Sequence, residues 1–235
     1  ELVGDRFGPS VVARSVDPML GGVYSSLAAD IGVREALPAL AGALDAGAPS
    51  LTAAVGELTS RASGAGPVFG TLVGGYTVLV DALINAAGIE PTTCSYVGDL
   101  RPVDAGWSVE VERGRHVVYD GVVLAMPAWQ AGHILRQGAP EISAPLQAVA
   151  RASSVVVSIA LEPGTAVPDH SGVLVATGDT LRAKAFTFSS QKWAHLGGDD
   201  GPVSVRASFG RYRAPVPEDR VEQGVDDRIV TEALE

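Results

Sequence analysis

Apolar residues recur at helical spacing in the first part of the chain. Between residues 33 and 44 they stand at 33, 36, 37, 40, 41 and 44, which is one face of an α-helix. An earlier helix is predicted over 10–24, ended by Pro18 and by a turn at Gly21-Gly22. Ser50 precedes another apolar segment and is a good N-cap candidate. Residues 1–62 are therefore predicted to be helical.

One further helix is predicted next, and segments with the pattern of strands come after it. Residues 76–88 predict a helix that ends at its last residue, a glycine. Residues 107–111 alternate apolar and polar side chains, which predicts a half-buried strand, and Gly114 stands where a hairpin turn is needed. The continuous apolar run at 122–127 predicts a strand buried on both faces, ended by its proline and followed by a helix.

The last part of the chain has the pattern of a sheet. Four strand-like runs of similar length are separated by loops rich in Gly, Pro and Asp, and they cover 153–161, 172–177, 184–190 and 203–209. Such spacing predicts an antiparallel sheet, and an acidic amphipathic helix is predicted over 218–235. The fold class is α+β. We expect a helical segment at 1–64, an α/β piece with too few strands to close a sheet at 65–145, and an antiparallel-sheet domain at 146–235.

Composition narrows the function classes. Hydrophobic residues make up 46 % and charged residues 19 % of the 235 residues, so the chain can bury a core and disorder is not expected. A net charge of −10 argues against nucleic acid as a partner. Cys94 is the only cysteine, which fits a reducing cytoplasm, and we expect it to be a small buried residue rather than a nucleophile. The four histidines have no i, i+4 pairing, so no metal site is expected.

The chain ends and the first helices bear on location. The chain begins without Met and stops within a predicted helix, so we expect a portion of a longer protein, with no secretory signal. No segment approaches the roughly 20 apolar residues that span a bilayer. Residues 1–62 are rich in Ala and Gly and contain no Lys, so membrane contact is expected to be peripheral at most and the location cytoplasmic.

Common catalytic motifs do not occur. The patterns GxGxxG, GxxxxGK[ST], HExxH and GxSxG are all missing from the sequence, and no Ser, His and Asp spacing singles out a triad. No catalytic residue is therefore predicted from spacing.

Several segments together resemble one family. The segments VFGTLVGGYTVLVDAL (68–83) and YDGVVLAMPAWQAGHIL (119–135) resemble the flavin-dependent amine oxidase superfamily. Within it, VDPMLGGVYS (16–25), GVLVAT (172–177) and FTFSSQKWAHLGGDDGPVSVRASFGR (186–211) resemble protoporphyrinogen and coproporphyrinogen oxidases. The pairing of SSQKW with VRASFGR is the most family-specific part. The resemblance covers nearly the whole chain, but only the central part of the family's length, without the glycine-rich FAD loop or the C-terminal element that caps the flavin.

The resemblance implies an activity. Such an enzyme oxidises coproporphyrinogen III to coproporphyrin III, or protoporphyrinogen IX to protoporphyrin IX, in haem biosynthesis, with FAD as cofactor and dioxygen as oxidant. Residues 65–145 would be part of the FAD-binding domain and the other two segments would bind the substrate. Pathway enzymes of the ferrochelatase type are candidate protein partners. Since the pyrophosphate-binding loop is missing from the sequence, we expect this chain alone not to hold FAD tightly and to be inactive.

Matching to the family gives candidate site residues. Those on the substrate side are Met19, Gly22, Gly172, Leu174, Lys184 and Phe186. Those on the cofactor side are Val97, Ala125, Pro127 and Ala128. Phe188 is an alternative for ring stacking, and Arg206 and Arg211 are alternatives to Lys184 as anchors for substrate propionates. Each also has a structural interpretation: a glycine turn, strand packing, a core aromatic, a solvated cation, or a strand ended by proline. Trp129 departs from the small residue that the family pattern has there.

Two other functions stay open on the sequence. One is a different amine-oxidase-like flavoprotein, such as a carotenoid desaturase or a polyamine oxidase. The other is a non-catalytic module that binds porphyrin without flavin.

Overall fold

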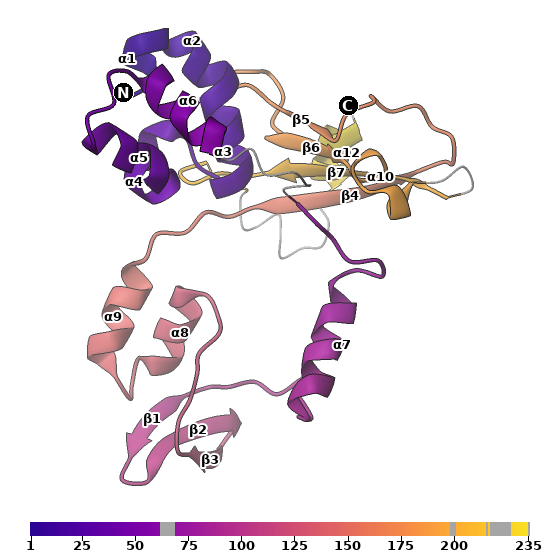
Figure 1. Cartoon of the computed structure of the whole chain (residues 1–235). Helices are drawn as coiled ribbons and strands as arrows, with labels where there is room; N and C mark the ends of the chain where they lie inside the picture. Colours follow the sequence, from indigo (N-terminus) through magenta and orange to yellow (C-terminus); the bar gives the residue numbers. More distant parts are fainter. Residues whose placement is uncertain (62–68, 198–200, 215, 217–226, 235) are drawn as a thin grey trace. The chain divides into compact units, whose positions relative to one another are not determined.

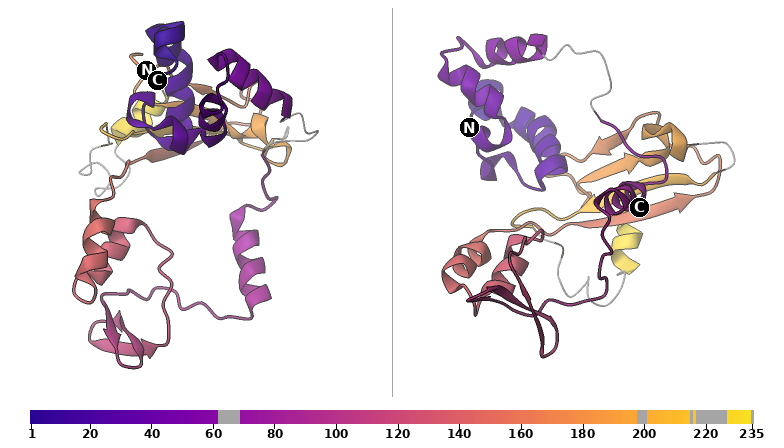
Figure 2. Two further views of the ribbon diagram at one scale, coloured as in Figure 1. Left: turned by 60° about the vertical axis from the view of Figure 1, so that its left-hand side comes forward. Right: turned by 60° about the horizontal axis from the view of Figure 1, so that its bottom comes forward.

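The chain folds into two compact units, drawn in Figures 1 and 2. The computed structural model describes residues 1–61, 69–197, 201–214, 216 and 227–234. The first unit joins residues 1–73 to residues 152–235, and the second unit is residues 74–151. The architecture is α+β, as the sequence predicts.

The first unit begins with a run of short helices. These are α1 (Gly4–Phe7), α2 (Pro9–Val11), the π-helix η1 (Val12–Val16), α3 (Asp17–Tyr24), the 3₁₀-helix η2 (Ala28–Asp30), α4 (Val33–Ala36), α5 (Pro38–Asp45) and α6 (Leu51–Arg61). The predicted cap is confirmed, because the Ser50 Oγ accepts a hydrogen bond from the backbone N–H of Ala53 at 3.0 Å. A small core of Leu40, Leu51 and Ala54 holds these helices together.

The prediction that Pro18 and the glycine pair end the first helix is wrong. Pro18 lies in the first turn of α3, and Gly21 and Gly22 lie inside that helix. A proline lacks the N–H of the helix ladder and crowds the carbonyl four residues earlier. The π-helical turn η1, directly before α3, widens the ladder at this point. The helix ends at Ser25, which has left-handed backbone angles (φ 52°, ψ 40°).

The predicted four-stranded antiparallel sheet is confirmed. Its strands are β4 (Val155–Leu161), β5 (Gly172–Leu174), β6 (Ala185–Phe188) and β7 (Val203–Phe209), in the order β4-β7-β6-β5. Two short helices, α10 (Ser189–Lys192) and η3 (Ala194–Leu196), follow β6, and α12 (Asp227–Leu234) is the described part of the predicted C-terminal helix. The rest of that predicted helix, and the strand-like entry proposed near residue 68, lie outside the described residues.

The two faces of this sheet differ. Phe186 pairs with Ala207 across β6 and β7, and both pack with Phe209 and with Ile229 of α12 in a common core. We call this the core face. Because side chains alternate along a strand, the neighbouring positions point to the other side, which we call the open face. Its members include Gly172, Leu174, Thr187, Arg206 and Ser208.

The second unit is a three-stranded meander with helices. It contains α7 (Tyr76–Ala87), β1 (Leu100–Val103), β2 (Gly106–Glu112), β3 (Arg115–Tyr119), α8 (Ala128–Leu135) and α9 (Pro140–Ala148). The predicted hairpin at Gly114 is confirmed, since this glycine has φ 79° between β2 and β3. The core joins the sheet to α8 and consists of Leu100, Val109, Ile134, Leu135 and Ala139. Helix α7 has no buried residue along its whole length.

Two expectations in this unit are wrong. Residues 122–127 form no strand, and Val123 is 92 % exposed. A strand buried on both faces needs hydrogen-bonded neighbours, and β1 to β3 pair only with one another. Cys94 is exposed rather than buried, because it lies in the loop after α7 with a left-handed φ of 57°.

Candidate functional site

Helix α3 lies against the end of strand β5 in the first unit. A methyl group placed on Gly22 would lie 3.2 Å from the Leu174 Cδ2 atom, so helix and strand are in close contact here. Met19, one turn earlier, is 62 % exposed, and Leu174 is also exposed. The structure therefore brings Gly22 and Leu174 together, with Met19 on the same helix. The substrate-binding assignment of these residues stays a prediction.

Gly172 is held by the sheet itself. A methyl group on Gly172 would lie 2.4 Å from the carbonyl oxygen of Phe186, closer than any side chain tolerates. Glycine is needed there for β5 to pair with β6. Gly172 also shares a row of the open face with Thr187 and Arg206, and Arg206 is exposed.

Phe186 is not brought together with Gly22 and Leu174. The sheet register places Phe186 on the core face, where its ring packs beside Ala207 and Phe209. Phe188, two residues later, lies on the same face and is buried. Neither ring lies on the open face with Gly172 and Leu174.

Lys184 is buried rather than solvated. It is 5 % exposed, and its ammonium donates three hydrogen bonds, to Ser25 Oγ at 2.7 Å, Ser154 Oγ at 2.9 Å and the Gly210 carbonyl at 2.8 Å. These three bonds use every proton of the ammonium. Burial, and then the nearby charge of Arg211, lower the pKa of Lys184. Lys184 thus ties the end of α3 to the sheet.

Arg211 lies in a tight turn that also contacts the end of α3. The turn is closed by reciprocal backbone bonds between Arg211 and Ala214, at 2.9 and 3.0 Å. The Tyr212 N–H donates to the Ser25 carbonyl at 2.7 Å, and Arg213 forms an ion pair with Asp30 at 3.2 Å. The Arg211 Nε atom lies 3.3 Å from where a Gly21 methyl would be. Arg211 and Gly21 are thus direct neighbours.

The second unit holds a cavity beside the residues expected on the cofactor side. Its volume is about 430 Å³. The residues that line it are Ser95, Tyr96, Val97, Met126, Trp129, Gln130, His133 and Ile134. One cavity is therefore lined by Val97 together with Met126 and Trp129, which flank Pro127 and Ala128 in sequence. Ala125, Pro127 and Ala128 themselves do not line it.

The lining of this cavity suits a flat ring. Tyr96 and Trp129 supply aromatic surface, and Gln130 and His133 supply polar groups. Trp129, which departs from the family pattern, is held by Arg151, whose guanidinium lies 4.7 Å from the ring centre. These residues fit one ring system of an FAD molecule, and no phosphate-binding loop accompanies them in the sequence.

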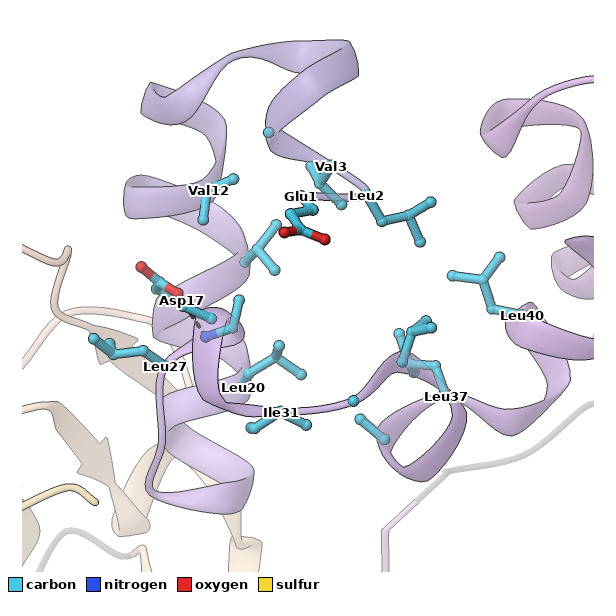
Figure 3. Close-up of a pocket in the computed structure, with 17 residues that line it drawn as sticks. Glu1, Leu2, Val3, Val12, Asp17, Leu20, Leu27, Ile31, Leu37 and Leu40 are labelled. Carbon is cyan, nitrogen blue, oxygen red and sulfur yellow. Dashed lines mark hydrogen bonds between the residues drawn. The ribbon is translucent and has the colours of Figure 1, made fainter. Parts of the chain in front are cut away.

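A second cavity was not expected from the sequence. It lies among the first helices, has a volume of about 550 Å³, and is shown in Figure 3. Aliphatic side chains such as Val12, Leu20 and Leu37 line it, and the buried carboxylate of Asp17 accepts a hydrogen bond from the Ala28 N–H at 2.8 Å beside it. The only sequence signal was the helical spacing of these aliphatic residues, which core packing explains equally well.

Among the described residues, no group of His, Cys, Asp and Glu could hold a metal ion. No described helix is long and apolar enough to cross a membrane.

Comparison with known proteins places these features in a wider group. The model of the family "Flavin containing amine oxidoreductase" matches residues 1–231. A coproporphyrinogen III oxidase of Mycobacterium leprae (strain TN) is 46 % identical over 212 residues, which are 90 % of this chain and 46 % of that protein. A coproporphyrinogen III oxidase of Propionibacterium freudenreichii subsp. freudenreichii is 29 % identical over 264 residues, covering 95 % of this chain and 49 % of that protein. The chain spans about half the length of the curated relatives that it matches.

Solved structures share the fold. A protein described as a protoporphyrinogen oxidase, from Exiguobacterium sp. 255-15, superimposes with a TM-score of 0.73 at 19 % identity, over 95 % of this chain and 49 % of that one. An oxidoreductase from Methanosarcina mazei gives a TM-score of 0.58 at 11 % identity, over 99 % of this chain and 50 % of that one. At these identities the likeness concerns the fold alone.

Proposed function

The chain belongs to the flavin containing amine oxidoreductase family, and from this premise we propose that it is part of an FAD-dependent porphyrinogen oxidase of haem biosynthesis. The reaction is the oxidation of coproporphyrinogen III to coproporphyrin III by dioxygen, with protoporphyrinogen IX as the alternative substrate. The observation that carries the proposal is 46 % identity to a coproporphyrinogen III oxidase over 90 % of this chain.

The first unit supports a substrate-binding role. Gly22, Leu174 and the open face of the sheet form an exposed surface of small and aliphatic residues with cations beside it. A flat apolar macrocycle with carboxylate substituents needs such a surface, with a few polar anchors at its edge. We assign Met19, Gly22, Gly172 and Leu174 to the substrate side. We do not assign Phe186 and Lys184 to direct contact with the substrate. The Phe186 ring packs in the core, and the Lys184 ammonium is hydrogen-bonded within the protein.

The second unit supports a cofactor-binding role. The cavity at Val97 and Trp129 would hold one ring system of FAD, and FAD supplies the acceptor for the substrate's hydrogens when bound. The protein's own contribution there is an apolar, aromatic wall that orients a ring. We propose that this chain without further sequence does not retain FAD, since no glycine-rich phosphate-binding loop accompanies the cavity in the sequence.

The test of activity uses the whole protein, reconstituted with FAD. Coproporphyrinogen III and protoporphyrinogen IX are prepared without oxygen, and porphyrin fluorescence is followed after air is admitted. We expect a rate well above the spontaneous oxidation, faster with coproporphyrinogen III. A rate equal to the spontaneous oxidation with both substrates would refute the proposal.

The state of the isolated chain is tested separately. The chain is purified with excess FAD, and its visible absorbance is recorded after gel filtration. We expect no flavin band, and a band near one flavin per chain would contradict this part of the proposal. The cytoplasmic location and the pathway partners of the ferrochelatase type stay predictions, to be checked by cell fractionation and by co-purification.

A further inference from the structure

The guanidinium of Arg211 has unused hydrogen-bond donors in a buried position. Its Nε and Nη2 atoms are both buried, and within the described residues neither has a hydrogen-bond partner. A buried donor without an acceptor is costly, so most such groups in proteins are paired. Two adjacent donors of one side chain left free together mark a place where an acceptor is missing.

The geometry of these two donors selects the missing acceptor. Nε–H and the neighbouring Nη2–H of an arginine point in parallel and match the two oxygens of one carboxylate. A backbone carbonyl or a hydroxyl would satisfy only one of them. The Nε–H and Nη2–H donors of Arg211 therefore match a planar anion with two oxygens, such as a carboxylate.

The neighbouring Lys184 adds a second positive charge and, as a donor, cannot accept a hydrogen bond from Arg211. Its ammonium is used up by two hydroxyls and a carbonyl, all of them neutral. The two cations are close enough that Arg211 lowers the pKa of Lys184. Within the described residues no carboxylate is hydrogen-bonded to either of these two cations, and the pair attracts an anion because the surrounding protein screens it poorly.

The location of Arg211 connects it to the proposed substrate surface. Arg211 lies beside Gly21, and the next residue, Gly22, contacts Leu174. Since Gly21 has no side chain, the space beside the Arg211 Nε atom is not filled by a methyl group. Arg211 as a whole is half-buried, whereas its Nε and Nη2 atoms are not exposed, so a ligand reaches them only after a local shift of the turn or of α3.

We propose that Arg211 binds a carboxylate of the substrate through Nε and Nη2, and that Lys184 supports it as a second, fixed positive charge. This inference rests on the proposed function and names the group that the site recognises. A chain with a net charge of −10 would repel a tetracarboxylate substrate. A local pair of cations provides the attraction that the chain as a whole lacks. Arg211 would then hold one carboxylate at the edge of the macrocycle.

The experiment measures binding of the stable product coproporphyrin III by the chain as it stands. Arg211→Lys keeps the charge but loses the parallel donor pair, and we expect its dissociation constant to rise about tenfold or more. Arg113→Lys is the matched control, because Arg113 is exposed on the β2–β3 turn, and its affinity should not change. Fluorescence quenching measures the affinity, and circular dichroism checks that each variant is folded.

A second variant and a spectroscopic signal guard against a folding defect. Gly21→Ala suits the helix interior but places a methyl group 3.3 Å from the Arg211 Nε atom, so it should weaken coproporphyrin III binding without unfolding the chain. In ¹H–¹⁵N spectra, the Arg211 Nε–H signal, assigned by its loss in Arg211→Lys, should shift as coproporphyrin III is added. Inorganic phosphate should compete poorly with coproporphyrin III.

Three results of the binding experiment with coproporphyrin III would each overturn the inference. These are no binding of coproporphyrin III by the unaltered chain, equal affinity of Arg211→Lys, or an Nε–H signal that stays in place. Competition by phosphate at equal concentration would assign the donors to a phosphate instead. Porphyrinogen turnover by the whole protein that is unaffected by Arg211→Lys would remove this inference and leave the proposed function standing.

Discussion

Replacing Gly172 by alanine tests the pairing of β5 with β6, on which the open face depends. The added methyl group would lie 2.4 Å from the Phe186 carbonyl oxygen, about 1 Å inside ordinary van der Waals contact. The obstacle is backbone rather than the end of a flexible side chain. Strand β5 therefore has to move away from β6, or the pairing has to open.

The magnitude follows from what has to move. Overpacking of this kind costs typically about 1–3 kcal/mol, and β5 offers only the short pairing of Gly172–Leu174 with β6 to resist it. We expect Gly172→Ala to lower the free energy of unfolding of the first unit by about 2–3 kcal/mol. For a unit of this size the midpoint of thermal unfolding should fall by roughly 5–10 °C.

Thermal unfolding followed by circular dichroism measures this change. Gly42→Ala is the matched control, because Gly42 lies in α5 of the same unit with nothing within 4 Å of the added methyl group. Alanine should be neutral or stabilising there, by up to about 1 kcal/mol. If Gly172→Ala unfolds at the same temperature as the unaltered chain, the register of β5 against β6 is wrong and the open face has to be redrawn.

Two further changes test contacts beneath the proposed substrate surface. Lys184→Met leaves the Gly210 carbonyl without its donor, whereas the Ser25 and Ser154 hydroxyls, 3.1 Å apart, remain hydrogen-bonded to each other. The free energy of unfolding in urea should therefore fall by about 1–3 kcal/mol. A gain in stability would contradict this. Because burial and Arg211 lower the pKa of Lys184 below 10.5, the unfolded chain binds the proton more tightly. The stability of the unaltered chain relative to Lys184→Met should then rise as the pH climbs from the folded pKa toward 10.5, and a fall in urea titrations would refute the assigned shift. Asp17→Ala removes the acceptor of the Ala28 N–H and should cost about 1–2 kcal/mol in thermal unfolding, whereas Asp17→Asn, which keeps a carbonyl oxygen, should cost clearly less.

Local patterns predicted the elements whose own residues determine them. Alternation predicted β2, glycine predicted the turn at Gly114 and the end of α7, and four evenly spaced runs predicted the antiparallel sheet. The strand predicted from the apolar run at 122–127 did not form, because no strand in the described part of the chain pairs with it. Pro18 failed because a π-turn, which no single-residue preference announces, relieves the crowding that proline causes.

The candidate site was predictable only in part, because it depends on distant contacts. Matching to a family indicated Gly22 and Leu174, and the structure places them in contact. Matching to a family also indicated Lys184, but its side chain is held by Ser25 and Ser154, far away in sequence. The Arg211 donors, which have no partner within the described residues, could not be predicted at all, since hydrogen-bond partners depend on residues distant in sequence.

Helix α7 has a consequence for how assembly can be followed. Its 12 residues have no buried side chain, and an isolated helix of that length is marginal in water. Its amide protons should therefore exchange with solvent almost as fast as those of an unfolded peptide, and slow down only when another surface covers its apolar residues. Hydrogen–deuterium exchange over 76–87, measured by mass spectrometry, would then show when another surface binds to α7.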